Sequence, residues 1–218
     1  IAVLEGLLSR VALPKLRLLY CHDCLLAGPI PEGLAACTSM QVLDLAGNRL
    51  AGPIPDVIGR CTALVTLLLQ NNHLSGTVPA WLGSCPQLAR VCLNGNKLEG
   101  TLPAALGRCG ALTELRVHGN QLSGRLPAAL GDCLALCHLD LDVSLLAGGL
   151  PDALQRRADD GELRINQPKL YTRAPQPGDT DVLKHGKSLK DFMRAGRPDE
   201  RRTSTGSMPL PITRPNAG

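Results

Sequence analysis

Residues 41–64 read QVLDLAGNRLAGPIPDVIGRCTAL, and the Leu, Asn, Gly and Pro positions of this stretch return every 24 residues along the chain. The next three copies read VTLLLQNNHLSGTVPAWLGSCPQL, ARVCLNGNKLEGTLPAALGRCGAL and TELRVHGNQLSGRLPAALGDCLAL, and end at Leu136. Looser copies at 17–40 and 137–160 flank them, so the unit occurs six times. A unit of this size cannot bury its own apolar face and must pack against the next one. The chain is therefore predicted to be a stacked solenoid.

Each copy divides into a strand, a turn and a return segment. Leu or Val at positions 3 and 5 alternates with other residues, which is the period-2 pattern of a short strand with one buried face. Asn at position 8 of four copies is expected to point inward and to hydrogen-bond backbone groups left free as the strand turns. Gly at position 12 permits a turn, and Pro at position 15 fixes an extended stretch. The apolar residues that follow predict a helical or 3-10 return segment on the outer side.

The pattern LxxLxLxxNxLxGxIPxxLGxCxxL resembles the plant-type leucine-rich repeat family over 144 of the 218 residues. The resemblance implies an α/β solenoid, a right-handed coil with a parallel inner sheet, short helical or 3-10 outer segments and an extended C-terminal tail. It also implies that the variable strand residues of the inner sheet recognise proteins or peptides.

The first and last copies depart from the pattern, as terminal copies should. Cys24 and Ser144 replace the Asn, and Arg157 and Asp160 replace a buried Cys and Leu. The expected organisation is a lead-in or partial repeat over 1–16, six repeats over 17–160, and a basic, Pro-rich tail over 161–218.

The inner face consists of strand positions 2, 4 and 6, which alternate with the buried positions. It grades from apolar side chains in the first copies to charged ones in the last, a mixture that suits a polypeptide partner. A merely solvated sheet is the alternative. The residues expected to bind the partner are Tyr20, His22, Asp44, Leu68, Gln70, Arg90, Asn94, Glu114, Arg116, His118, His138 and Asp140.

Nothing in the sequence predicts catalysis, a cofactor or a metal site. There is no nucleophile elbow, phosphate-binding Gly loop or HExxH motif. Five of the nine cysteines stand 24 residues apart and are expected to form a buried column of free thiols: Cys37, Cys61, Cys85, Cys109 and Cys133. Cys21-His22-Asp23-Cys24 has the spacing of half a zinc site, but the chain contains no second CxxC.

The tail differs from the repeats in charge. Residues 161–218 hold 11 Lys and Arg against 6 Asp and Glu, whereas residues 1–160 hold 12 against 13. Within the tail, Ser188 and Gly196 bracket a short expected helix, 188–195, that would pack on the solenoid or dock in a partner groove. An acidic protein surface is the expected partner, and the scarcity of aromatic residues disfavours nucleic acid. The docking residues would be Leu189, Lys190, Phe192, Met193, Arg194, Arg201 and Arg202.

Two functions remain open. The first is a non-catalytic intracellular scaffold or adaptor that binds a protein through the solenoid and is tethered by its tail in a larger cytoskeletal, ciliary or organellar assembly. The absence of Asn-X-Ser/Thr sequons and of paired-cysteine caps favours this cytoplasmic hypothesis, and no apolar run is long enough to span a membrane. The alternative is a fragment of a secreted or receptor-type recognition ectodomain.

Overall fold

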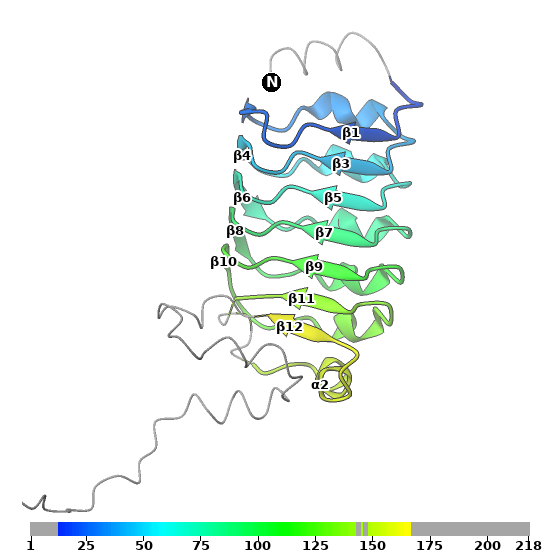
Figure 1. Cartoon of the computed structure of the whole chain (residues 1–218), viewed down its shortest axis with the longest axis vertical. Coiled ribbons are helices and arrows are strands. Elements are labelled where there is room, and N and C mark those ends of the chain that lie inside the picture. The colour runs from blue at the N-terminus through cyan, green and yellow to red at the C-terminus, as the bar shows by residue number, and fades with distance from the viewer. Residues whose placement is uncertain (1–12, 143–144, 146–147, 167–218) are drawn as a thin grey trace, which may run out of the picture. The chain divides into compact units, whose positions relative to one another are not determined.

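The computed structural model describes residues 13–142, 145 and 148–166, and these residues form a stack of coils with one parallel sheet along its inner side (Figure 1). Successive strands pair in register with a shift of 24 residues, so that Leu43 lies between Leu19 and Leu67. The fold class predicted from the sequence is thus confirmed. The sheet order within the described residues is β1 (Leu18–Tyr20), β3 (Val42–Asp44), β5 (Thr66–Leu68), β7 (Arg90–Cys92), β9 (Glu114–Arg116), β11 (His138–Asp140) and β12 (Arg164–Asn166).

A second parallel sheet, which the sequence did not predict, runs along one edge of the stack (Figure 1). In the second to fifth repeats its strands begin directly after the Asn, and three of the five strands end at the Gly of position 12. That glycine has a positive φ of 74° to 94° in the first five repeats, which explains why other side chains are avoided there. The strands are β2 (Ala27–Gly28), β4 (Arg49–Gly52), β6 (His73–Thr77), β8 (Lys97–Gly100) and β10 (Gln121–Leu122).

The return segments are short 3-10 helices that start directly after the repeated Pro. Consecutive segments pack so closely that a Cβ atom built on Gly83 would lie 2.1 Å from the carbonyl oxygen of Ala105. In the last coil an α-helix, α2 (Asp152–Asp159), takes this place. The 3-10 helices are η1 (Glu32–Ala36), η2 (Asp56–Arg60), η3 (Ala80–Ser84), η4 (Ala104–Arg108) and η5 (Ala128–Asp132).

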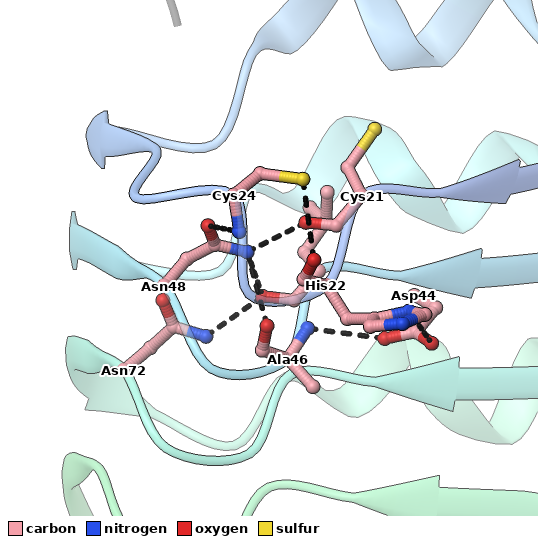
Figure 2. Close-up of polar contacts among 8 residues, drawn as sticks. Cys21, His22, Cys24, Asp44, Ala46, Asn48 and Asn72 are labelled. Carbon is pink, nitrogen blue, oxygen red and sulfur yellow. Dashed lines mark hydrogen bonds and ion pairs between the residues drawn. The ribbon is translucent and has the colours of Figure 1, made fainter.

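The core consists of stacked Leu, Ile and Val side chains, with the column of five cysteines fully buried among them. Beside it runs the expected ladder of Asn side chains. The Nδ2 atom of Asn72 donates to the carbonyl of Leu69 in its own coil and to that of Leu45 in the preceding coil, and its Oδ1 atom accepts from the Leu50 amide. Figure 2 shows Asn48 and Asn72 in this role. The ladder therefore ties each coil to the one before it.

The solenoid ends differently from the expectation. Strand β12 extends the inner sheet into the segment that was assigned to the tail, which puts the last strand six residues past residue 160. Arg157 closes the cysteine column, because its guanidinium donates to the carbonyl oxygens of Cys133, Leu134 and Leu136. Residues 1–12 and 167–218, which include most of the lead-in and the expected helix at 188–195, lie outside the described residues. None of the described helices is long and apolar enough to cross a bilayer.

Candidate functional site

The inner face of the sheet is built from alternate strand residues. In each strand the middle residue enters the core, and its two neighbours point to the other side of the sheet. Backbone hydrogen bonds continue this register past the strand ends, from Asn71 N to Asn94 O and from Gly95 N to His118 O. The structure thus brings the side chains expected at positions 2, 4 and 6 into one surface.

The first coils present an apolar part of this surface. Leu18 and Tyr20 on β1 are 51% and 59% exposed, and Leu68 on β5 is half-buried. Next to them the Nδ1 atom of His22 lies 3.1 Å from the Oδ2 atom of Asp44, while Asp44 Oδ1 accepts a hydrogen bond from the Ala46 amide (Figure 2). Asp44 is buried, so it orients His22 and the turn and does not itself reach a partner.

The middle coils hold a chain of ion pairs across three strands. Arg90 Nε on β7 lies 2.8 Å from Glu114 Oε2 on β9. Arg116 Nε contacts Glu114 Oε1 at 2.5 Å and Asp140 Oδ2 on β11 at 3.4 Å. Both carboxylates are buried beneath the two guanidinium groups, which are about half exposed. The arrangement fixes two arginines on the inner face with their outer nitrogen atoms available.

Glu114 is charged in this chain despite its burial. Burial by itself raises the pKa of a carboxyl group, but the hydrogen bond from Arg90 and the charges of Arg116 and Arg90 outweigh it and hold the pKa of Glu114 below its ordinary value. The same hydrogen bond raises the pKa of Arg90. The pairs therefore remain ionised at neutral pH.

Position 6 of three successive repeats carries polar side chains with an unpaired buried atom. The structure gives no hydrogen-bond partner among the described residues to Gln70 Oε1, Asn94 Oδ1 or His118 Nδ1. All three side chains are only half-buried, so part of each reaches the inner surface. His138, at position 2 of the last copy, differs from them, since its Nδ1 atom lies 3.1 Å from the Cys137 sulfur.

The sequence analysis placed these residues on one face, but it did not predict that the carboxylates are buried while the arginines remain half exposed. Asp44, Glu114 and Asp140 were expected as contact residues, and the structure buries all three. A sequence signal for the ion pairs exists, since Arg90 stands 24 residues before Glu114 and Arg116 two residues after it. The tail docking residues, from Leu189 to Arg202, lie outside the described part of the chain.

The cysteines have the properties of structural thiols. All nine are free in the structure. Burial raises the pKa of Cys61 and Cys109 in the column to about 11, and it does the same for Cys92 beneath the arginines. The described residues contain no group of three His, Cys, Asp or Glu side chains that could hold a metal ion.

The Leucine Rich Repeat family model matches residues 39–61, 63–85 and 111–133. No curated protein matches the chain. Similar solved structures include the BIR2 ectodomain from Arabidopsis thaliana, with 38% identity and a TM-score of 0.50 over 52% of this chain and 59% of that one. The LRR ectodomain of SOBIR1 from the same plant has 30% identity and a TM-score of 0.52 over 54% and 64%.

A longer receptor is also similar. The LRR ectodomain of the plant membrane receptor kinase GASSHO1/SCHENGEN3 from Arabidopsis thaliana, solved in complex with CASPARIAN STRIP INTEGRITY FACTOR 2, is 33% identical with a TM-score of 0.57. The match covers 66% of this chain but 18% of that one. The chain thus spans less than two thirds of each of these three ectodomains.

Proposed function

The chain is a leucine-rich-repeat protein of the plant type, and from this premise we propose that its inner face recognises a protein or peptide ligand. The observation that carries the proposal is the pair of half-exposed guanidinium groups of Arg90 and Arg116, which buried carboxylates hold in position. Arginines and tyrosines are the residues that contribute most often to binding at protein interfaces, and Tyr20 is exposed on the same face. The role is binding without catalysis.

We further propose that the chain belongs to a recognition ectodomain of the secreted or receptor type. Support comes from its similarity to plant ectodomains, one of which was solved in complex with CASPARIAN STRIP INTEGRITY FACTOR 2. The cytoplasmic, cytoskeletal and ciliary settings expected from the sequence find no support among these similar structures.

A second candidate, an intracellular adaptor, is favoured by the nine free cysteines, because a reducing compartment preserves free thiols. In that case the basic tail would attach the solenoid to an acidic surface in a larger assembly. Lysis of the cells directly into denaturant and an alkylating reagent, without reductant, separates the two candidates, because the denaturant exposes the buried thiols. Nine alkylated cysteines support the adaptor, whereas disulfides, or a signal peptide upstream of Ile1, support the ectodomain.

Site-specific crosslinking tests the binding face itself. A photoreactive amino acid at Leu68 on the inner face should crosslink the native partner, while the same amino acid at Glu99, exposed on the second sheet, serves as the matched control. Crosslinks from Glu99 alone would refute the proposal. A truncation after residue 166, which retains β12, tests the role of the tail: loss of the partner would assign binding to the tail and not to the inner face.

A further inference from the structure

Two cysteines of the first coil differ from the buried column. Cys21 and Cys24 flank a tight turn formed by His22 and Asp23. Cys24 is exposed and Cys21 is half-buried, whereas the five column cysteines are fully buried. A turn of this kind brings its first and fourth Cα atoms within about 7 Å of each other, and a disulfide spans Cα separations of about 4.4–6.8 Å. The two thiols are therefore close enough to form a bond with each other.

One side chain of the second coil holds this turn. The Nδ2 atom of Asn48 donates to the carbonyl oxygen of Cys21 at 2.7 Å, and its Oδ1 atom accepts from the amide of Cys24 at 3.1 Å (Figure 2). The same Oδ1 atom accepts from the amide of Leu26 at 2.9 Å. A single amide group thus fixes the backbone of both cysteines and of the residues that follow them.

The backbone on either side of Cys24 has an uncommon conformation. Asp23 and Leu25 have φ angles of 52° and 55°, and although Asp tolerates this left-handed region, a bulky residue such as Leu rarely adopts it. The residues that correspond to Leu25 in the second to fifth copies have no positive φ, so the strain is particular to the first coil. Strain of this kind clusters at functional sites and persists where the surrounding contacts hold the backbone. Here Asn48 supplies those contacts.

The two thiols differ in how readily they react. The thiolate is the nucleophile in thiol–disulfide exchange. Burial and the charges of Cys24 and Asp44 raise the pKa of Cys21, so the exposed Cys24 is the sulfur that an external disulfide meets first. The effect of Cys24 on the pKa of Cys21 agrees with their closeness in the turn. The column cysteines do not compete for the reagent, because they are fully buried and burial raises their pKa as well.

We propose that Cys21 and Cys24 form a redox-active pair that a small disulfide, such as glutathione disulfide, oxidises. The Cys24 thiolate attacks one sulfur of that disulfide, which forms a mixed disulfide and releases one glutathione thiolate. The Cys21 thiolate then attacks the Cys24 sulfur, which forms the Cys21–Cys24 bond and releases the second glutathione. The pair loses two electrons, which reduce the glutathione disulfide, and its two protons pass to the two glutathione molecules.

The reaction is reversible. Excess reduced glutathione runs both steps backward, so the pair is oxidised in an oxidising compartment and reduced in a reducing one. This chemistry is separate from ligand recognition by the inner face and does not depend on it.

Oxidation of the folded full chain tests the pair. The reduced protein is equilibrated in glutathione buffers of increasing disulfide content, quenched with acid and alkylated with N-ethylmaleimide in denaturant. The tryptic peptide 18–49 contains Cys21, Cys24 and Cys37. After oxidation it should carry one N-ethylmaleimide, on Cys37, and no glutathione. Dithiothreitol should restore all three alkylation sites, and the far-UV circular dichroism of the chain should not change.

Single variants test the order of the two steps. In Cys21→Ser and Cys24→Ser the second thiol is missing, so the remaining cysteine should retain glutathione as a stable mixed disulfide. Cys24 in the first variant should react at least about tenfold faster than Cys21 in the second, because Cys21 is half-buried and its pKa is raised.

A further pair of variants tests the role of Asn48 as a positioning residue. Asn48→Ala removes the contacts to both cysteines and should lower the equilibrium constant for oxidation at least about threefold, because the two sulfurs are no longer held together. Asn96→Ala is the matched control, since it removes the same ladder side chain from coils without such a pair. Its equilibrium constant should equal that of the unmodified chain.

Four results would overturn the inference. Three alkylated cysteines in peptide 18–49 after oxidation would show that no bond forms, and a stable glutathione adduct on Cys24 of the unmodified chain would show that Cys21 does not reach it. Disulfide-linked dimers would show that the sulfurs meet other molecules instead of each other. Oxidation that requires denaturant would show that the folded turn prevents the bond. Equal oxidation of the Asn48→Ala and Asn96→Ala variants would remove Asn48 from the mechanism.

Discussion

Replacement of Asn96 by Ala tests the physical basis of the stack. The Nδ2 atom of Asn96 donates to the carbonyls of Leu69 and Leu93, at 2.9 and 3.0 Å, and its Oδ1 atom accepts from the Leu74 amide at 3.0 Å. The three hydrogen bonds that Asn96→Ala removes differ in how much their loss costs. Asn72 also donates to Leu69 O and Asn120 also donates to Leu93 O, so both carbonyls keep one partner, whereas the Leu74 N–H loses the acceptor that Asn96 provides.

The expected cost follows from that asymmetry. An orphaned buried N–H costs about 1–3 kcal/mol, and each carbonyl that drops from two partners to one loses about 0.5–1 kcal/mol. The free energy of unfolding should therefore fall by about 2–5 kcal/mol. Asn96→Asp should be at least as damaging, because a carboxylate cannot donate to the two carbonyls.

Urea denaturation followed by far-UV circular dichroism and by the fluorescence of Trp81, the chain's one tryptophan, measures the change. The two probes must coincide for a single free energy to be defined. Gln121→Ala, at an exposed position of β10, is the control and should change stability by less than about 0.5 kcal/mol. A loss below 1 kcal/mol for Asn96→Ala, or a stable Asn96→Asp variant, would refute the account of the ladder.

Three further predictions concern packing, the C-terminal end and the thiols. Gly83→Ala should destabilise the chain by about 1–3 kcal/mol, since the new methyl group would collide with the Ala105 carbonyl. Gly110→Ala is the control and should not destabilise the chain, because the space around Gly110 is open. Equal melting temperatures for the two variants would contradict this prediction. Arg157→Ala removes the hydrogen bonds that cap the column, so hydrogen exchange should accelerate in β11, β12 and α2 before it does in β5; uniform exchange would argue against a local cap. For fully reduced protein at pH 8, the column cysteines should stay protonated and unreactive toward a thiol reagent, because burial raises their pKa. Rapid labelling of more than three of the nine thiols before denaturant is added would contradict the burial of the remainder. The three expected to react are Cys21, Cys24 and Cys137.

The repeat positions could be predicted because each meets a local requirement that recurs unchanged in the inner coils. Asn72 and Asn96 must satisfy the same backbone groups, and Cys61 and Cys85 fill the same buried space. Such requirements restrict the residue type independently of the neighbours, so a single sequence displays the Asn in four copies and the Cys in five. The ladder, the cysteine column and the inner sheet are therefore all confirmed.

Features that depend on neighbouring coils were missed. The strands of the second sheet form only where stacked copies meet, and a strand as short as Ala27–Gly28 has no periodicity of its own. Strand β12 was not predicted, because it does not follow the 24-residue spacing. Arg164 pairs with His138 at a spacing of 26 residues, since α2 replaces the shorter 3-10 segment in the last coil. On the inner face, the alternation of buried and surface positions correctly placed Glu114 outside the core. It could not predict that the long side chains of Arg90 and Arg116 cover Glu114.

The shared carbonyls have a consequence for how the length of this protein can change. Because each Asn side chain reaches both its own coil and the preceding one, a segment can be inserted or removed without loss only if both of its ends fall at equivalent points of the repeat. Gain or loss of 24 residues leaves every junction chemically identical, whereas a change of ten residues would leave one junction without its amide bridge. Duplication of whole coils is thus the route by which such a chain grows, and each new coil adds three freely variable side chains to the surface that meets the ligand.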